Sequence, residues 1–500
     1  MMTRPAVKPA TAIEPSTEDA RVLESMGYTQ ELSRTLNPFS NFAVSFSIIC
    51  ILSGGINSIS QSISGVGGAG IGIGWLVGSF ISLIFALAMA QIGSAFPTAG
   101  ALYHWSSILG GRGWGWLTAW LNLTGLVTVL GAINVGTFYF FMGAFGSSLG
   151  WEPTFAVQAA FVTGITALQA LINHLGIKLT ARLTDFSGYL IFGTAMALTV
   201  TLLAYAPDWD LSRLVTFKNY SGEAGGGVWP ATSNMWLLFG LGLLLPIYTI
   251  TGFDGAAHTA EETKNASRFV PKSIVSSVLW SALFGYVMLS SFVIAIPDMD
   301  KAALLGAGVF FGTMDAVVPA TLKQFLYGAI LVSQLLCGLA TVTSASRMMF
   351  AFARDGGLPA SGALKKVHAF WRTPVTAIWT AALISVLFTL YTPVYTTIVS
   401  VTVIFIFISY SMPAMAGGLA YGTRWTRMGP WDMGRIFRPL ALLVSLVTVF
   451  IVFLGIQPPN AAALHVTLGF LVLTAIIWFG FERRRFQGPP VASLTKEGDS

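Results

Sequence analysis

Two short runs in this apolar chain could expose backbone groups that bind a small ligand. The first is Ser-Gly-Gly-Ile at positions 53–56, and the second extends from Pro246 to Thr-Gly-Phe at positions 251–253. Adjacent glycines or a proline weaken a helix, and inside a membrane the freed amides and carbonyls must find another partner. Freed amides at the positive end of a half-helix attract a carboxylate, whereas freed carbonyls attract an ammonium group or a cation.

Asp254 follows the second run directly and is the one acidic residue expected well inside a membrane. A buried carboxylate is unfavourable unless it is paired or protonated, so such a residue is functional by default. Asp254 could bind the ammonium of an extended ligand, carry a proton, or pair with polar groups of the first helix. His258 lies one helical turn further on and could share a proton with Asp254, or it could serve only as a donor between helices.

Charged residues are expected near one end of these helices, among them Arg34, Glu261 and Glu262. Pairs between Arg34 and the two glutamates would form an inner gate that breaks and reforms when the protein changes its access. The alternative is a solvated loop whose charges only set the orientation in the membrane.

The composition places the chain in a membrane, since 54% of its 500 residues are hydrophobic and only 10% are charged, against about a quarter in soluble proteins. A soluble enzyme, a secreted scaffold and a nucleic-acid-binding domain are excluded. Both cysteines lie in apolar runs, and none of the five histidines stands at ligand spacing from another. We therefore expect no catalytic residues, no metal site and no cofactor.

Charge-free stretches long enough for helices of about 20 residues predict an all-α integral membrane protein with twelve membrane-spanning helices. The two interrupted runs fall in the first and the sixth helix. Because five is odd, a repeat of five helices starts once from each side of the membrane, which is an inverted repeat. The predicted organisation is a tail over 1–34, helices 1–5 over 35–206, an outer loop over 207–232, helices 6–10 over 233–423, helices 11 and 12 over 436–482, and a tail over 483–500.

The basic residues predict the orientation. If both termini are cytoplasmic, 23 of the 27 Lys and Arg residues lie on the cytoplasmic side, and the other four are Arg213, Lys218, Lys301 and Lys323. We therefore expect a multi-pass protein of a plasma membrane, such as a bacterial inner membrane. The polar first 34 residues do not resemble a cleavable signal peptide. Segment 302–322, which Asp315 interrupts, is expected to be an outer loop that holds a short helix.

Three runs resemble the amino acid-polyamine-organocation permeases. Ser-Ala-Phe-Pro-Thr-Ala-Gly-Ala-Leu-Tyr at 94–103 resembles the family's loop between helices 2 and 3. Thr-Gly-Phe-Asp at 251–254, with the glutamates at 261 and 262, resembles the amino acid/choline branch that contains GABA permeases. Segment 346–359 is similar to the end of helix 8. The resemblance implies the leucine-transporter-like fold, a five-plus-five inverted repeat with two extra C-terminal helices, and amino acid transport.

The resemblance also implies roles for the residues at the two interruptions. In relatives, amides of the first interruption receive the substrate carboxylate, carbonyls of the second receive the amino group, and an aromatic ring covers the substrate. The matching residues here are Ser53, Gly54, Gly55 and Ile56 for the carboxylate, Tyr248, Thr249 and Thr251 for the amino group, and Phe253 for the cover. Gly252, between them, is also expected to bind the substrate. Some relatives carry a coupling lysine in helix 5, but the matching position here is the apolar Ile191.

The expected function is therefore secondary active transport of an amino acid or a related compound such as GABA by alternating access, as a proton symporter or an exchanger. The alternative is a substrate sensor, or a carrier of an organocation such as choline or a polyamine, on the same fold. The expected partners are a small amino acid-like substrate, protons and membrane lipid, but no nucleic acid. The identity of the substrate and the oligomeric state stay open.

Overall fold

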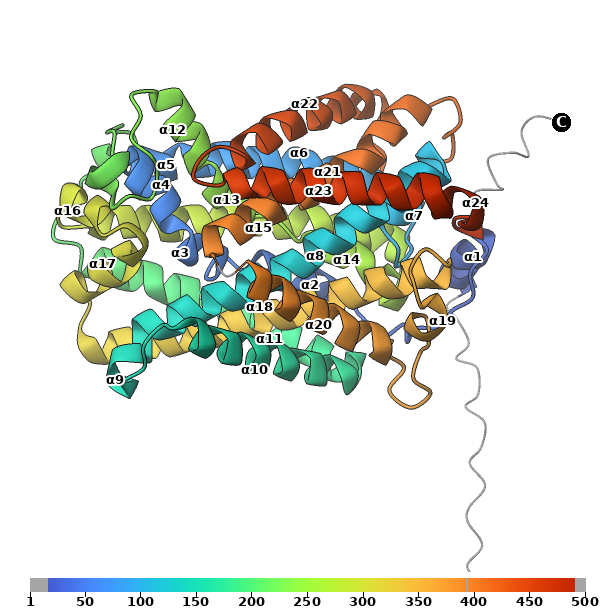
Figure 1. Cartoon of the computed structure of the whole chain (residues 1–500), viewed down its shortest axis with the longest axis horizontal. Coiled ribbons are helices and arrows are strands. Elements are labelled where there is room, and N and C mark those ends of the chain that lie inside the picture. The colour runs from blue at the N-terminus through green and yellow to red at the C-terminus, as the bar shows by residue number, and fades with distance from the viewer. Residues whose placement is uncertain (1–16, 393, 491–500) are drawn as a thin grey trace, which may run out of the picture.

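The computed structural model describes residues 17–392 and 394–490. In these two ranges the chain is helical, and its only β contacts are two isolated bridges, Leu36 with Thr263 and Tyr421 with Trp425. The long helices run side by side along the long axis of the molecule (Figure 1).

The first half of the chain begins with a short helix outside the bundle and continues with helices whose turns are mostly short. These elements are α1 Thr17–Ser25, α2 Pro38–Ile49, α3 Gly54–Asn57, α4 Ile59–Val66, α5 Ala69–Gly72, α6 Gly74–Ala95, α7 Leu102–Gly110, α8 Arg112–Phe141, α9 Ser147–Leu149, α10 Phe155–His174 and α11 Ile177–Ala204.

A long connection with two short 3-10 turns leads to the second half. Its helices are α12 Met235–Gly242, α13 Leu244–Thr249, α14 Gly255–His258, α15 Ala266–Ala295, α16 Met299–Leu304, α17 Val309–Val317, α18 Ala320–Arg354, α19 Ser361–Leu364, α20 Val375–Tyr391, α21 Tyr395–Ala420, α22 Phe437–Gly455, α23 Ala461–Ile477 and α24 Arg483–Arg485.

Ten helical segments of the described chain are long and apolar enough to cross a membrane. Two shorter apolar segments, Met235–Thr249 and Val375–Tyr391, occupy the positions where the sequence predicts the sixth and the ninth crossing. The segment expected to be an outer loop holds two short helices, α16 and α17.

Burial separates a central layer from a peripheral one. The most apolar windows of the segments Pro38–Val66 and Tyr395–Ala420 are each 89% buried, whereas those of the last two segments, Gly434–Gly455 and Ala461–Arg485, are only 28% and 17% buried. The first helical segment packs against α11, α15 and α18, and α3 contacts α13 and α8. The interrupted helices therefore lie in the core, while α22 and α23 present apolar side chains outward.

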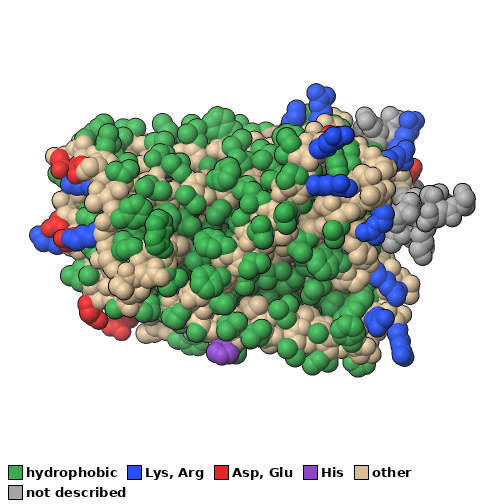
Figure 2. All heavy atoms as spheres, turned by 90° about the horizontal axis from the view of Figure 1, so that it is seen from above, with side chains coloured by type: hydrophobic (Ala, Val, Ile, Leu, Met, Phe, Trp, Pro, Cys, Tyr) green, Lys and Arg blue, Asp and Glu red, His purple; other side chains and the backbone are tan. Residues whose placement is uncertain are grey.

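The two ends of the molecule differ in charge. Figure 2 shows a broad hydrophobic belt with Lys and Arg side chains gathered at one end, which is the end that holds α1, α19 and α24 in Figure 1. We call this the basic end. Acidic and basic side chains are mixed at the opposite end, where α16 and α17 lie.

Candidate functional site

The first interrupted helix breaks slightly earlier than its glycines suggest. Helix α2 ends at Ile49, Cys50 leaves the helical region with φ 12° and ψ 88°, and helical turns resume at Gly54. Gly54 is required for a different reason, because a Cβ there would lie 2.8 Å from Oγ1 and 2.9 Å from Cα of Thr249. The glycine therefore allows the two interrupted helices to touch each other.

The second interruption lies where the sequence predicts it. Helix α13 ends at Thr249 and α14 begins at Gly255. Gly252 has φ +89°, a conformation that residues with a side chain rarely adopt, and a Cβ there would overlap the side chain of Ile48. Glycine is thus required at this position both by the backbone and by the approach of α2.

A small cavity lies between the two interruptions. It has only about 10 Å³ of space for the centre of a water molecule, so it has room for about one water. Five of the expected site residues line it, namely Ser53, Gly54, Tyr248, Thr249 and Thr251. The remaining walls are Ile48, Ile49, Val129, Ile133 and Cys337. An amino acid requires a wider site, so this conformation is a closed one.

The chemistry of the cavity is neutral, since none of its ten lining residues is charged. The amides of Ser53 and Gly54 both donate to the carbonyl of Cys50, at 2.8 and 3.2 Å, so the turn is closed on itself in this conformation. The hydroxyl of Thr251 donates to the carbonyl of Tyr248 at 2.7 Å. Backbone groups of both interruptions therefore reach the cavity but are already hydrogen-bonded there.

Four expected site residues lie away from the cavity. Gly55, Ile56, Gly252 and Phe253 are buried nearby but do not line it. The ring of Phe253 packs on Tyr410, with 4.8 Å between the ring centroids, so it does not cover the cavity as the resemblance implies. Tyr410 belongs to α21, so the Phe253 ring packs against that helix.

Asp254 lies at the centre of a fully buried hydrogen-bond cluster. Its Oδ1 accepts from the hydroxyl of Tyr410 at 2.7 Å, and its Oδ2 lies 3.2 Å from both Nδ2 of Asn122 and Nε2 of His258. These partners belong to α21, α8 and α14, so the expected alternative of polar partners on the first helix is wrong. Asp254 also does not line the cavity.

The Asp254 cluster is linked through Tyr410 to the second interruption on one side and to the basic end on the other. The amide of Gly252 donates to the Tyr410 hydroxyl at 3.0 Å, and the same hydroxyl donates to Asp254. On the other side, Nδ1 of His258 lies 3.2 Å from the carbonyl of Ala99, whose amide donates to Glu261. Asp254 is thus in contact with the backbone of the second interruption.

Buried ion pairs lie beyond this cluster toward the basic end. Arg354 donates to both oxygens of Glu261 at 2.8 and 3.0 Å, and Arg347 donates to both oxygens of Glu262 at 3.1 Å. Both arginines belong to α18 and are seven residues apart, which places them on one face two turns apart. The pairs connect the segment after α14 to α18.

The expected pairing of Arg34 with these glutamates is wrong. Arg34 lies 3.8 Å from Asp19 and donates to the carbonyl of Thr263 at 2.6 Å. The glutamates pair instead with Arg347 and Arg354, which belong to the run at 346–359 and which the sequence predicts only to lie on the cytoplasmic side. An arginine inside an apolar helix was the available signal, because such a residue needs a buried carboxylate.

A fourth buried carboxylate, Asp355, accepts hydrogen bonds from two tyrosines and lies beside a histidine. Its Oδ2 accepts from the hydroxyls of Tyr28 and Tyr103, both at 2.8 Å, and lies 3.2 Å from Nε2 of His104. Tyr28 precedes the membrane helices, so it connects the N-terminal segment to α7 and to the end of α18.

Charge and burial act in opposite directions on the pKa values of Glu261 and Asp355. Burial raises the pKa of Glu261, but the Arg354 guanidinium and the Ala99 amide outweigh it and hold the pKa below its usual value. Burial likewise raises the pKa of Asp355, but the hydrogen bond from His104 and the charge of Arg354 hold it below its usual value. Both groups are therefore ionised at neutral pH.

Comparison with known proteins gives a family match over most of the chain. The family model described as "Amino acid permease" matches residues 36–481. This range contains both interruptions, the Asp254 cluster and the buried ion pairs.

Individual relatives are similar over nearly their whole lengths. The chain is 29% identical to an "Amino-acid permease BAT1 homolog" of Oryza sativa subsp. japonica, over 93% of this chain and 94% of that protein. It is 29% identical to "Amino-acid permease BAT1" of Arabidopsis thaliana, over 93% and 95%. It is 25% identical to the "GABA-specific permease" of Saccharomyces cerevisiae, over 95% of this chain and 86% of the relative.

Proposed function

This chain belongs to the amino acid permease family, and we propose that it carries a neutral amino acid across the plasma membrane by proton-driven alternating access. The observation that carries the proposal is the contact between the two interrupted helices, where Gly54 packs on Thr249 beside a neutral cavity. Interrupted helices at corresponding positions of two repeats typically hold the substrate of such transporters.

The proposed topology has twelve crossings, with α12–α13 and α20 as the two short ones. Helices of the first half form one five-helix repeat, those from α12 to α21 form the inverted second repeat, and α22 and α23 are additional. The basic end faces the cytoplasm, as the excess of Lys and Arg there indicates (Figure 2). Both termini are then cytoplasmic.

The neutral walls of the cavity define the proposed substrate class. When the closed turn opens, the amides of Ser53 and Gly54, which now donate to the carbonyl of Cys50, become free for a carboxylate, and the carbonyls around Tyr248 become free for an ammonium. A charged substrate side chain would be buried there without a counter-ion, which is unfavourable. A zwitterion with an uncharged body, either an α-amino acid or GABA, fits these groups better than an acidic or basic amino acid or choline.

Asp254 is the proposed coupling group because no permanent cation neutralises it. The Tyr410 hydroxyl bonds both to Asp254 and to the amide of Gly252, so protonation of Asp254 changes a hydrogen bond made to the second interruption. His258 provides the neighbouring site that can exchange the proton. The ion pairs of Glu261 with Arg354 and of Glu262 with Arg347 form the proposed inner gate, and Arg34 lies beside it.

The experiment is uptake of labelled compounds into liposomes that contain the purified protein, with and without an inward proton gradient. We expect gradient-dependent accumulation of neutral amino acids or GABA, and at least tenfold lower rates for glutamate, lysine and choline. No flux of any compound in folded protein would contradict the transport proposal. Equal rates for charged and neutral compounds would contradict the proposed substrate class.

A further inference from the structure

A second cavity opens at the basic end, outside the proposed transport site. Its volume is about 470 Å³, within the range of about 300–1,000 Å³ that small-molecule sites occupy. It is lined by Glu31, Arg354, Gly362, Lys365, Lys366 and Val367. Three cationic side chains and one carboxylate thus surround a space that can hold a small molecule.

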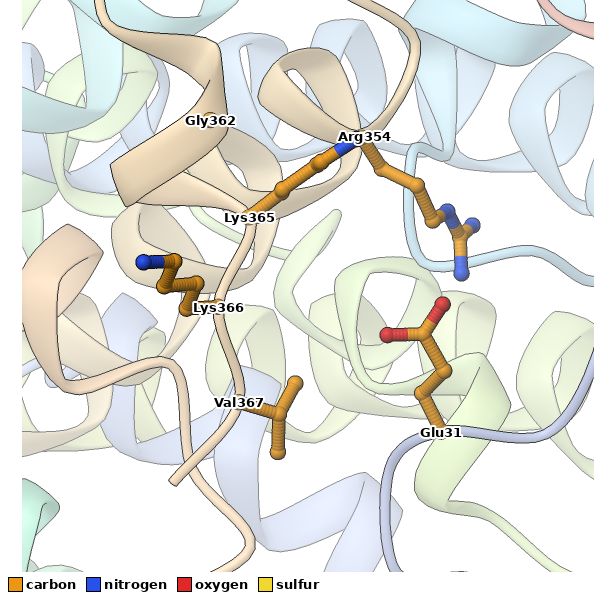
Figure 3. A pocket seen from close by; sticks show the side chains of 6 residues that line it. All are labelled: Glu31, Arg354, Gly362, Lys365, Lys366 and Val367. Atoms are coloured by element: carbon orange, nitrogen blue, oxygen red, sulfur yellow. The ribbon is translucent and has the colours of Figure 1, made fainter. Parts of the chain in front are cut away.

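Three of the four charged residues of this cavity have no charged partner within the described residues, whereas Arg354 pairs with Glu261. Glu31, Lys365 and Lys366 make no ion pair or side-chain hydrogen bond within the described residues. Figure 3 shows the Arg354 guanidinium and the Glu31 carboxylate pointing toward one another across the cavity. The chain has no Asp or Glu from position 356 to 431, so no acidic residue accompanies the two lysines in sequence.

Arg354 adds a buried donor that lacks an acceptor. Its side chain is only 9% exposed, two of its nitrogens bind Glu261, and its Nε is buried without a hydrogen-bond partner. Arg354 nevertheless lines the cavity, so its positive charge can attract an anionic ligand there.

We propose that this cavity binds the phosphate ester of a polyol, with Arg354, Lys365 and Lys366 on the phosphate and Glu31 on a hydroxyl of the polyol. Arginine and lysine are the usual phosphate-binding residues. A carboxylate opposite them repels a plain phosphate but accepts hydrogen bonds from hydroxyl groups. The ligand is therefore a glycerol phosphate-like group.

Two sources can supply this group, a lipid headgroup of the inner leaflet or a free polyol phosphate. The aromatic residue Phe370 follows the lysines closely and is 77% exposed, as expected for a side chain that lies at the membrane surface. Arg354 also binds Glu261, so the ligand contacts the same residue that closes the proposed inner gate.

The test is binding to the full-length protein in a neutral detergent, by native mass spectrometry and thermal shift. The probes are inorganic phosphate, glycerol 3-phosphate, short-chain phosphatidylglycerol and short-chain phosphatidylcholine. Binding of the lipid alone identifies a headgroup site, and equal binding of glycerol 3-phosphate identifies a soluble ligand; both results support the proposal. Binding of none of the phosphate esters, or equal binding of phosphatidylcholine, would overturn it.

Two double variants and one single variant test whether the ligand binds at these residues. The double variant Lys365→Gln/Lys366→Gln is expected to weaken binding at least tenfold. The matched control Lys264→Gln/Lys272→Gln removes two exposed lysines near the start of α15 and should change binding less than twofold. Glu31→Gln should abolish the preference for glycerol 3-phosphate over inorganic phosphate. Equal losses in the two double variants would show a diffuse charge effect and overturn the proposal.

Discussion

The protein buries carboxylates in two regions and treats them differently. At the basic end, Glu261 and Glu262 each have a bidentate arginine. In the core, Asp254 has only a tyrosine, an asparagine and a histidine. An arginine stays charged at any physiological pH, whereas a histidine does not.

The two kinds of partner determine which buried charge can change during transport. A carboxylate held by arginine keeps its charge and connects two segments of the chain. The two pairs of the proposed inner gate, Glu261 with Arg354 and Glu262 with Arg347, therefore act as clamps that form or break as the gate closes or opens. Asp355 is also held by two tyrosines and a histidine, but the charge of Arg354 acts on it as well. Asp254 has no such arginine among its partners, so it can take up a proton without leaving an unpaired cation. The comparison therefore assigns closure to the glutamates and proton coupling to Asp254.

Removal of one member of a clamp is expected to have the largest effect. Glu262→Gln leaves Arg347 as an uncompensated charge, and both side chains are fully buried. Breaking a buried pair in this way costs about 3–5 kcal/mol, so we expect a large drop in the unfolding midpoint of the purified protein, followed by tryptophan fluorescence.

Two further variants control this measurement. Glu262→Gln/Arg347→Met removes both charges and should regain much of the lost stability. Asp300→Asn breaks an exposed pair with Lys218 and should change the midpoint little. If Glu262→Gln is no more destabilising than Asp300→Asn, the clamp interpretation is wrong.

A smaller effect is expected where the two interrupted helices touch. Gly54→Ala places a Cβ against Thr249 and forces the helices apart. We expect the initial rate of uptake into liposomes to fall at least tenfold, which corresponds to about 1.4 kcal/mol. Gly164→Ala, where no atom lies within 4 Å of the added carbon, is the matched control. Equal rates in both variants would show that the contact is unimportant.

The smallest expected effect is the loss of folding stability at low pH that follows from protonation of Glu261. Its pKa in the folded protein lies below the usual value, so its stabilising contribution is complete above the unfolded pKa of about 4.3 and is lost as the pH falls through the folded value. The unfolding midpoint should therefore decrease when the pH is lowered below about 4. The Glu261→Gln variant should be less stable than the wild type at pH 7, but its unfolding midpoint should change less as the pH is lowered. Parallel curves for the two proteins would contradict this assignment.

The sequence predicts the helices and one interruption well, because both depend on local patterns. Long apolar runs define the spans, and Pro246 with Gly252 marks the break after α13. The break in the first helix lies earlier than predicted, because a glycine that permits a close contact cannot be distinguished in sequence from one that interrupts a helix. Gly54 has the first of these roles.

Partners of the buried charges could not be obtained from sequence. Tyr410 is 156 positions from Asp254, and Arg347 is 85 positions from Glu262. Sequence places charged residues at a common depth but does not show which way each helix turns its side chains. For this reason the sequence predicts the wrong carboxylates for Arg34, and it predicts that Phe253 covers the cavity, whereas its ring packs on Tyr410.

If Asp254 takes up the proton that drives transport, Asp254→Asn should uncouple transport from the proton gradient. Asparagine keeps the size of the side chain and can still hydrogen-bond to Tyr410 and Asn122, but it cannot be ionised. In liposomes, wild-type protein should accumulate substrate under an inward proton gradient. The variant should lose this accumulation and retain exchange of labelled for unlabelled substrate. Proton-driven accumulation by the variant at the wild-type level would contradict this role of Asp254.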